Sequence, residues 1–195
     1  MNLANKITIV RIGMIPLFML AFYQYPAWMT EHFDFLADFN QYGLYWAAAV
    51  FVIAAATDKL DGYVARKYNQ ITNLGKLIDP LADKLLVSTA LVMMVQYNMI
   101  SSWIAVAIIG REIVVSGIRI VAASQGVALA ADKHGKVKLV LQVAAIVAVM
   151  LSNFPFSYIT SFPVDFAIMI IAVAITVYSG CKYIMNNYRK LQLNL

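Results

Sequence analysis

The chain has 195 residues, of which 62% are hydrophobic and only 13% are charged, and its mean hydropathy is +0.74. Soluble domains are about half apolar, so this composition indicates an integral membrane protein and excludes an ordinary soluble one. Fifteen Lys and Arg residues against ten Asp and Glu residues give a formal net charge of +5. This excess fits membrane orientation and attraction to anionic lipid heads, and we see no nucleic-acid-binding motif. The single cysteine excludes an intramolecular disulfide framework.

Six segments are long and apolar enough for transmembrane helices, which need about 20 residues at 1.5 Å each. We expect them at residues 7–25, 42–68, 74–97, 101–125, 136–152 and 162–187. Basic residues precede the first apolar run as in a signal peptide, but no small-x-small cleavage site follows, so we expect a retained helix that Pro26 ends. No repeat or long linker divides the chain. It is therefore predicted to be a single all-α membrane domain, residues 1–195.

The distribution of basic residues predicts the orientation of these helices. With the N-terminus inside, the outer connections are residues 26–41, 98–101 and 153–162, and none of them contains Lys or Arg. The first connection carries only acidic charges, including Glu31 and Asp38. Because Lys and Arg concentrate on the inner side of membrane proteins, we expect both termini at the cytoplasmic face of the cell membrane.

The stretch of 26 residues from Asp58 to Asp83 holds four of the ten carboxylates, and the sequence on either side of it is almost wholly apolar. Asp58 and Asp61 are three residues apart, and Asp79 and Asp83 are four apart, so each pair occupies one face of a helix. The polar stretch between the pairs predicts a turn that folds two helices into an antiparallel hairpin. Four converging carboxylates repel one another unless cations compensate them. We therefore predict two divalent cations, Mg²⁺ or Mn²⁺, which prefer oxygen ligands and suit displacement at a phosphoryl group.

Small residues adjoin the aspartates. Gly62 follows the second aspartate, Gly75 lies one turn before the third, and Ala65 is also small. Together they leave room for a bulky ligand, such as the base and ribose of a nucleotide, although small residues also serve close helix packing in membranes. Arg66, at the end of the second predicted helix, suits bidentate contact with a phosphate group or else lies at the membrane interface as a snorkelling side chain.

The fourth predicted helix carries charges at membrane depth. Counted from its outer end, Arg111 lies about 15 Å deep, where an arginine must pair or line a polar cavity. Arg119 lies two turns closer to the cytoplasm and about 80° around the helix, so the two arginines can flank one anionic ligand. Lys136 follows at the inner end. These residues predict a cationic pocket for an acceptor that carries its own phosphate group.

Structural roles remain open for several charged residues. Arg111 could pair with Glu112 or with one of the aspartates. We interpret Glu112 as a structural partner of an arginine rather than as a catalytic acid. Lys133 and Lys138 also fit ordinary basic residues of the cytoplasmic face, and His134 fits a solvated loop histidine.

The aspartates form a recognisable pattern: Asp58-x-x-Asp61-Gly-x-x-Ala-Arg, eight residues, then Gly75-x-x-x-Asp79-x-x-x-Asp83. It resembles the signature of the CDP-alcohol phosphotransferase family at every specified position. The resemblance implies transfer of a phosphatidyl or similar group from a CDP-linked donor to an alcohol, with release of CMP. It implies two divalent ions held by the first three aspartates and shared with the fourth. It further implies that Asp83 is the general base for the acceptor hydroxyl, and that the protein is a homodimer.

Two further stretches resemble family members that use glycerol phosphate. Residues 111–119, Arg-Glu-x-x-x-Ser-x-x-Arg, imply sn-glycerol 3-phosphate as acceptor, bound by the arginines, and CDP-diacylglycerol as donor. Residues 2–11 are similar to the family opening Asn-x-x-Asn-x-x-Thr-x-x-Arg, with Ala4 where proline is common. Asn5 and Thr8 then contact the nucleotide, or they act as interfacial caps. Three alternatives stay open: a phosphatidylinositol phosphate synthase, another CDP-alcohol phosphotransferase, and a cation transporter or channel.

Overall fold

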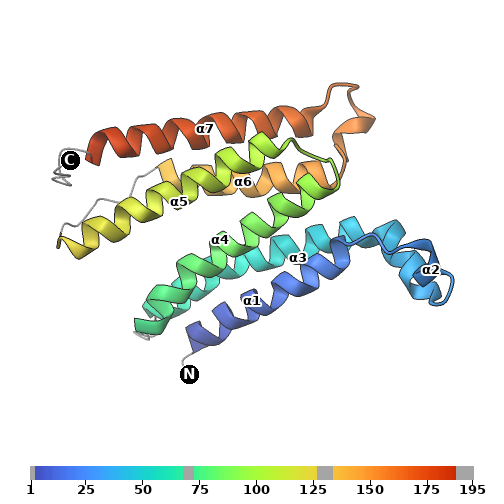
Figure 1. Ribbon diagram of the computed structural model, residues 1–195, viewed down its shortest axis with the longest axis horizontal. Coiled ribbons are helices and arrows are strands. Elements are labelled where there is room, and N and C mark those ends of the chain that lie inside the picture. Colours follow the sequence, from blue (N-terminus) through green and yellow to red (C-terminus); the bar gives the residue numbers. More distant parts are fainter. Residues whose placement is uncertain (1–2, 68–72, 127–133, 188–195) are drawn as a thin grey trace. The chain divides into compact units, whose positions relative to one another are not determined.

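Figure 1 shows a computed structural model of the chain, which describes residues 3–67, 73–126 and 134–187. Within these ranges, the side chains of residues 3–5, 58–67, 73–80 and 134–137 lie outside the description. The described residues contain helices and connections and no β-strand. The α-helices are α1 (Leu3–Phe22), α2 (Ala27–Thr30), α3 (Asp34–Lys67), α4 (Asn73–Gln96), α5 (Ser102–Ser124), α6 (His134–Met150) and α7 (Val164–Asn187), and a 3₁₀ helix, η1, spans Phe156–Tyr158.

The six long helices of the described chain overlap the six predicted helical segments. α1 begins four residues and ends three residues before its predicted bounds. The ends of α4 to α7 lie within two residues of the predicted ends, because apolar runs bounded by polar residues mark helix ends well. α3 ends at Lys67 and α4 begins at Asn73, and the polar turn predicted between them, at residues 68–72, lies outside the described part of the chain.

The prediction for the first outer connection, residues 26–41, is wrong in part. α3 begins at Asp34 rather than at residue 42, and the short helix α2 lies in the same stretch. Tertiary contacts explain the extension. Leu36 is buried, and the Asn40 side chain both donates to the carbonyl of Tyr25 (2.8 Å) and accepts from its N–H (2.7 Å). These contacts stabilise a helix where the polar residues alone favour a loop.

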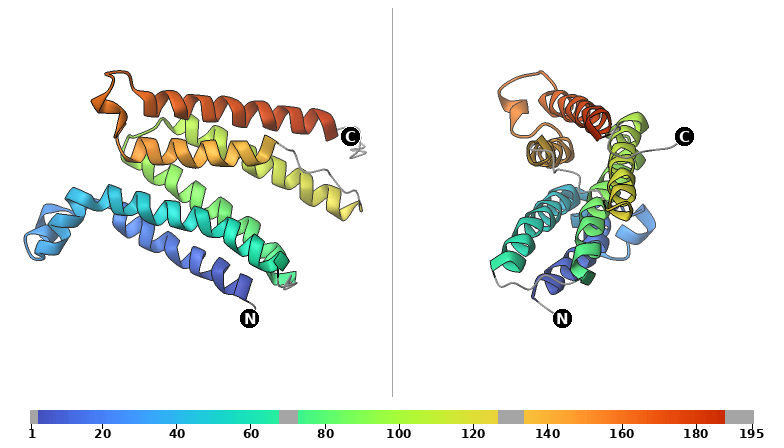
Figure 2. Two further views of the ribbon diagram at one scale, coloured as in Figure 1. Left: turned by 180° about the vertical axis from the view of Figure 1, so that it is seen from behind. Right: turned by 90° about the vertical axis from the view of Figure 1, so that its left-hand side faces the viewer.

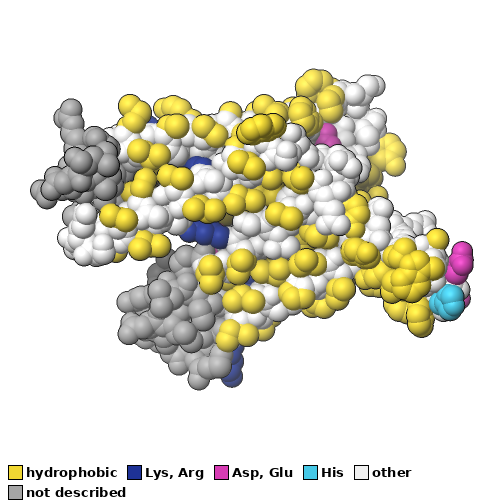
Figure 3. Space-filling model, viewed as in Figure 1, with side chains coloured by type: hydrophobic (Ala, Val, Ile, Leu, Met, Phe, Trp, Pro, Cys, Tyr) yellow, Lys and Arg dark blue, Asp and Glu magenta, His cyan; other side chains and the backbone are white. Residues whose placement is uncertain are grey.

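The surface of the helices is strongly apolar. Two segments among the described residues are long and apolar enough to cross a membrane: Asp34–Thr57, with mean hydropathy 1.2, and Val164–Asn187, with mean hydropathy 2.0. Large apolar side chains stay exposed, including Trp46, Ile120 and Met185. Hydrophobic side chains also cover much of the face drawn in Figure 3. Exposed apolar surface of this extent indicates contact with lipid.

The chain divides into two compact units, Met1–Tyr97 with α1 to α4 and Asn98–Leu195 with α5 to α7. A single domain, residues 1–195, stays a prediction. In the first unit, α1 packs against both α3 and α4, and α3 also contacts α4, as Figure 2 shows. The ring of Phe18, at the centre of this unit, lies 5.5 Å from that of Phe22 and 5.9 Å from that of Phe51.

Gly43 allows α1 and α3 to approach closely. A Cβ atom at this position would lie 2.4 Å from the carbonyl oxygen of Ala21 in α1, which is closer than atoms can pack. The close approach depends on this residue having no side chain.

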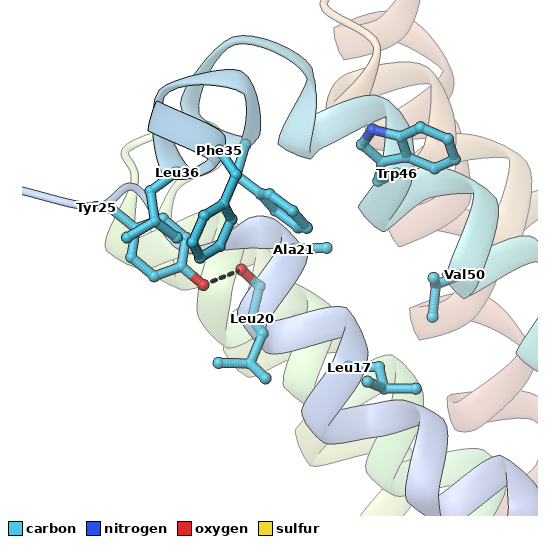
Figure 4. Close-up of a pocket in the computed structure, with 9 residues that line it drawn as sticks. Leu17, Leu20, Ala21, Tyr25, Phe35, Leu36, Trp46 and Val50 are labelled. Atoms are coloured by element: carbon cyan, nitrogen blue, oxygen red, sulfur yellow. Dashed lines mark hydrogen bonds between the residues drawn. The ribbon is translucent and has the colours of Figure 1, made fainter. Parts of the chain in front are cut away.

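A cavity of about 370 Å³ lies between α1 and the first turns of α3, with a lining that includes Leu17, Phe35 and Trp46 (Figure 4). Tyr25 borders it and donates a hydrogen bond from its hydroxyl to the carbonyl of Leu20, at 3.0 Å. The cavity lies toward the opposite end of α3 from Asp58 and Asp61, so it is not part of the predicted site.

In the second unit, α7 packs against both α5 and α6. The buried residues of α7 are Met169, Ala172, Thr176, Ser179, Gly180, Tyr183 and Asn187. This face therefore changes from apolar near the start of the helix to small and polar near its end. Small and polar residues between membrane helices permit close approach and interhelical hydrogen bonds. This half of α7 meets the charged residues of α5.

Candidate active site

The helix ends place the two carboxylate pairs in matching positions along α3 and α4. Asp61 lies six residues before the end of α3, and Asp79 lies six residues after the start of α4, so each is about 9 Å from its end of the helix. Asp58 and Asp83 lie about one turn further from the same ends. Because α3 and α4 contact one another and run in opposite directions (Figure 1), the pairs occupy similar levels of one hairpin.

Of the predicted metal ligands, only Asp83 has a described side chain, and it is half-buried. Asp58, Asp61 and Asp79 lie in the described helices, but their side chains are outside the description. The same holds for other predicted site residues: Asn5, Gly62, Ala65, Arg66, Gly75 and Lys136. Among the described side chains, no group of three or more His, Cys, Asp or Glu gathers in one place. The binding roles of the predicted site residues therefore stay predictions.

A buried polar contact fixes α1 next to the first carboxylate pair. Arg11 is fully buried, and its Nε donates a hydrogen bond to Oγ1 of Thr57, at 3.2 Å. Thr57 in turn donates to the carbonyl of Ala54, at 2.6 Å, and directly precedes Asp58 in α3. Thr8, one turn before Arg11, is also buried and lies inside α1, so its interpretation as an interfacial cap is wrong.

In the second unit, Glu112 pairs with two cations. Its Oε1 accepts a hydrogen bond from Nη1 of Arg111, at 3.1 Å, and also contacts Nζ of Lys138 in α6. The predicted pairing of Glu112 with an arginine is confirmed. Lys138 is only 5% exposed, which differs from the expectation of an ordinary basic residue at the membrane surface. A buried lysine needs a partner of this kind because its charge loses contact with water.

Both predicted acceptor arginines contact α7. Nη2 of Arg111 donates to Oγ of Ser179, at 3.1 Å. Nε of Arg119 donates to the hydroxyl of Tyr183, at 3.4 Å, and its guanidinium carbon lies 5.4 Å from the centre of the tyrosine ring. Ser179 and Tyr183 are four residues apart, so they lie on one face of α7. The two arginines therefore contact neighbouring turns of the same helix.

Comparison with known proteins identifies the family. Residues 1–178 match the model of the CDP-alcohol phosphatidyltransferase family. The chain belongs to this family. It is 42% identical over 196 aligned residues to a Bacillus subtilis protein, covering 98% of this chain and 97% of that protein. A Rickettsia felis protein is 35% identical over 182 residues, with 93% of each chain covered. A Shigella flexneri protein is 32% identical over 189 residues, covering 94% of this chain and 93% of that protein.

All three relatives are named CDP-diacylglycerol–glycerol-3-phosphate 3-phosphatidyltransferase. Membership in the CDP-alcohol phosphatidyltransferase family confirms the resemblance predicted from the two aspartate pairs. The chain is therefore an enzyme, a transferase, and the alternative of a cation transporter or channel is not supported. The family match over residues 1–178 spans both the two aspartate pairs and the arginines of α5.

Sequence reasoning missed the residues that hold the arginines. Thr176, Ser179 and Tyr183 occur three and four residues apart in a mostly apolar helix, which is a signal for a buried polar face. Lys138 lies two residues after Lys136, so the two positions are about 200° apart around α6. The described contact with Glu112 belongs to Lys138, and the side chain of Lys136 lies outside the description.

Proposed function

We propose that this protein transfers the phosphatidyl group of CDP-diacylglycerol to sn-glycerol 3-phosphate, giving phosphatidylglycerol phosphate and CMP. The observation that carries the proposal is the 42% identity, over 98% of the chain, to the Bacillus subtilis protein of that name. The two arginines of α5 support an acceptor with a phosphate group, because guanidinium groups bind phosphate in a bidentate manner. The same feature favours this acceptor over alcohols without a phosphate group, such as choline and serine.

The enzyme acts in the cell membrane as one catalytic domain of six transmembrane helices, with both termini and the active site at the cytoplasmic face. The exposed apolar side chains of the helices support contact with the bilayer. The connections 26–41, 98–101 and 153–162 contain no Lys or Arg, which supports their position on the outer side. Nucleotides and divalent cations are available at the opposite, cytoplasmic side. The enzyme forms a homodimer in this proposal, as the family resemblance implies.

Two divalent cations, Mg²⁺ or Mn²⁺, fit the donor set of Asp58, Asp61, Asp79 and Asp83. All four donors are carboxylates, and the helix ends bring the two pairs to similar levels of the α3–α4 hairpin. When bound, such ions neutralise negative charge on the diphosphate of the donor and on the leaving CMP. Gly62, Ala65, Arg66 and Gly75 belong to the same hairpin, and together with Asn5 and Thr8 of α1 they bind the CDP moiety in this proposal.

The remaining chemistry belongs to the side chains of the protein. Asp83 accepts the proton of the acceptor hydroxyl while that oxygen bonds to the phosphorus of the phosphatidyl group. The bond between this phosphorus and the CMP oxygen then breaks, and CMP leaves. Arg111, Arg119 and Lys136 bind the acceptor phosphate in this proposal.

The test uses purified full-length protein in lipid nanodiscs with CDP-diacylglycerol and Mg²⁺ or Mn²⁺. We expect release of CMP that depends on sn-glycerol 3-phosphate, and a lipid product with two phosphate groups. Inositol phosphate, choline and serine serve as competing acceptors. Preference for inositol phosphate would replace the proposed acceptor by that of a phosphatidylinositol phosphate synthase. Absence of acceptor-dependent CMP release with every acceptor and both metals would refute the proposed reaction.

A further inference from the structure

We propose that Gly180 is a positioning residue for the acceptor site: its missing side chain lets Arg111 lie across α7 in the orientation that binds the acceptor phosphate. The proposal rests on the function proposed above, in which Arg111 contacts the acceptor. Gly180 itself touches neither substrate and acts only through the arginine.

The space beside Gly180 is filled by Arg111. A Cβ atom at Gly180 would lie 2.8 Å from Cγ of Arg111, 3.5 Å from its Nε and 3.7 Å from its Cδ. Packed carbon atoms are normally about 3.5–4.0 Å apart, so the closest of these distances cannot be kept. Any side chain at position 180 therefore forces Arg111 to move.

The movement reaches the guanidinium group. Cγ lies near the start of the arginine side chain, while its far end is held by Glu112, at 3.1 Å, and by Ser179, at 3.1 Å. A displaced Cγ carries the rest of the side chain with it unless several torsion angles change together, so we expect at least one of these hydrogen bonds to lengthen. The orientation of the phosphate-binding group thus depends on the absence of a Cβ atom one residue after Ser179.

The surroundings allow this displacement without separating the helices. A cavity of about 220 Å³ lies beside both residues and is lined by Val114, Val177 and other side chains of α5 and α7. It gives a displaced arginine side chain room to move. We therefore expect Gly180→Ala to fold and to misplace Arg111, rather than to unfold the second unit.

The test compares Gly180→Ala with Gly117→Ala, which makes the same chemical change in α5. Outside the local backbone of α5, no atom of the described residues lies within 4 Å of a Cβ added at Gly117. Gly180→Ala is expected to raise the KM for sn-glycerol 3-phosphate by about 10- to 100-fold, because small misplacements of a positioning group have effects of this size. The KM for CDP-diacylglycerol should not change. Gly117→Ala should leave both constants at the wild-type values.

A double-mutant cycle separates positioning from a general structural effect. Arg111→Ala removes the Cγ atom that clashes, so adding Gly180→Ala to it should change the acceptor KM by less than about twofold. A large additional effect in this background would overturn the proposal, as would a wild-type acceptor KM for Gly180→Ala alone. A wild-type acceptor KM for Arg111→Ala would instead refute the acceptor role of Arg111 in the proposed function.

A second variant keeps the proposal testable if Gly180→Ala does not fold. Ser179→Ala removes the acceptor of the Arg111 hydrogen bond and adds no atoms. It should raise the acceptor KM in the same direction while the donor KM stays constant. An unchanged acceptor KM in Ser179→Ala would show that α7 does not position Arg111, and would overturn the proposal.

Discussion

The carboxylate of Glu112 offers the sharpest test of how the second unit is stabilised. It is shared by Arg111 and Lys138, and the side chains of Glu112 and Lys138 are 23% and 6% exposed. Glu112→Gln keeps the size of the side chain but leaves two cations close together without the negative charge between them. Removing one partner of a buried ion pair costs about 3–5 kcal/mol, and of an exposed pair at most about 1 kcal/mol. Given the partial exposure of Glu112, we expect a loss of about 2–4 kcal/mol.

The free energy of unfolding is measured by reversible unfolding in mixed micelles of a mild detergent and dodecyl sulfate. Glu31→Gln is the matched control, because it makes the same change at an exposed position and should alter the stability by no more than about 0.5 kcal/mol. Adding Lys138→Met to Glu112→Gln should restore part of the loss, since it removes one of the two cations that contact Glu112. Equal stabilities of Glu112→Gln and Glu31→Gln would refute this reasoning.

Four further predictions concern packing and chemistry. Gly43→Ala should lower the free energy of unfolding by about 1–3 kcal/mol, because the new Cβ meets the backbone of Ala21, whereas Gly13→Ala, with open space around it, should not. Asp83→Asn should abolish turnover and keep some binding of CDP-diacylglycerol, measured with labelled donor; complete loss of binding would indicate an essential metal ligand rather than a base. Arg119→Ala should raise the acceptor KM about tenfold, and an unchanged KM would remove it from the site. Chelation of divalent cations should stop CMP release, and Mg²⁺ or Mn²⁺ should restore it.

The helices and the reaction class could be predicted from the sequence because their signals are local. Apolar runs define the long helices, and the carboxylate pairs lie three and four residues apart on single helices. The start of α3 could not be predicted in the same way. It depends on the contact of Asn40 with Tyr25, which are separated by 15 residues and a turn. Without knowledge of such a contact, polar residues between two apolar runs predict a loop.

The surroundings of the acceptor arginines are non-local for the same reason. Arg111 and Ser179 are 68 residues apart, and Arg119 and Tyr183 are 64 apart. The depth of Arg111 in its helix predicts that it must have polar partners, but it does not identify them. The sequence suggested Glu112, which is adjacent, or one of the aspartates. The choice of Ser179 depends on how α7 packs against α5.

The glycines show why the remaining part of the site could not be predicted from the sequence alone. In the sequence, all glycines are alike: each is a position without a side chain, where another part of the protein or a ligand can occupy the space. At Gly43 that space is taken by the backbone of a neighbouring helix, at Gly180 by the side chain of Arg111, and at Gly117 by no atom within 4 Å. For Gly62 and Gly75 we propose that the occupant is the CDP moiety. The role of each glycine thus follows from its occupant, so a substitution by alanine tests the identity of that occupant rather than the flexibility of the chain.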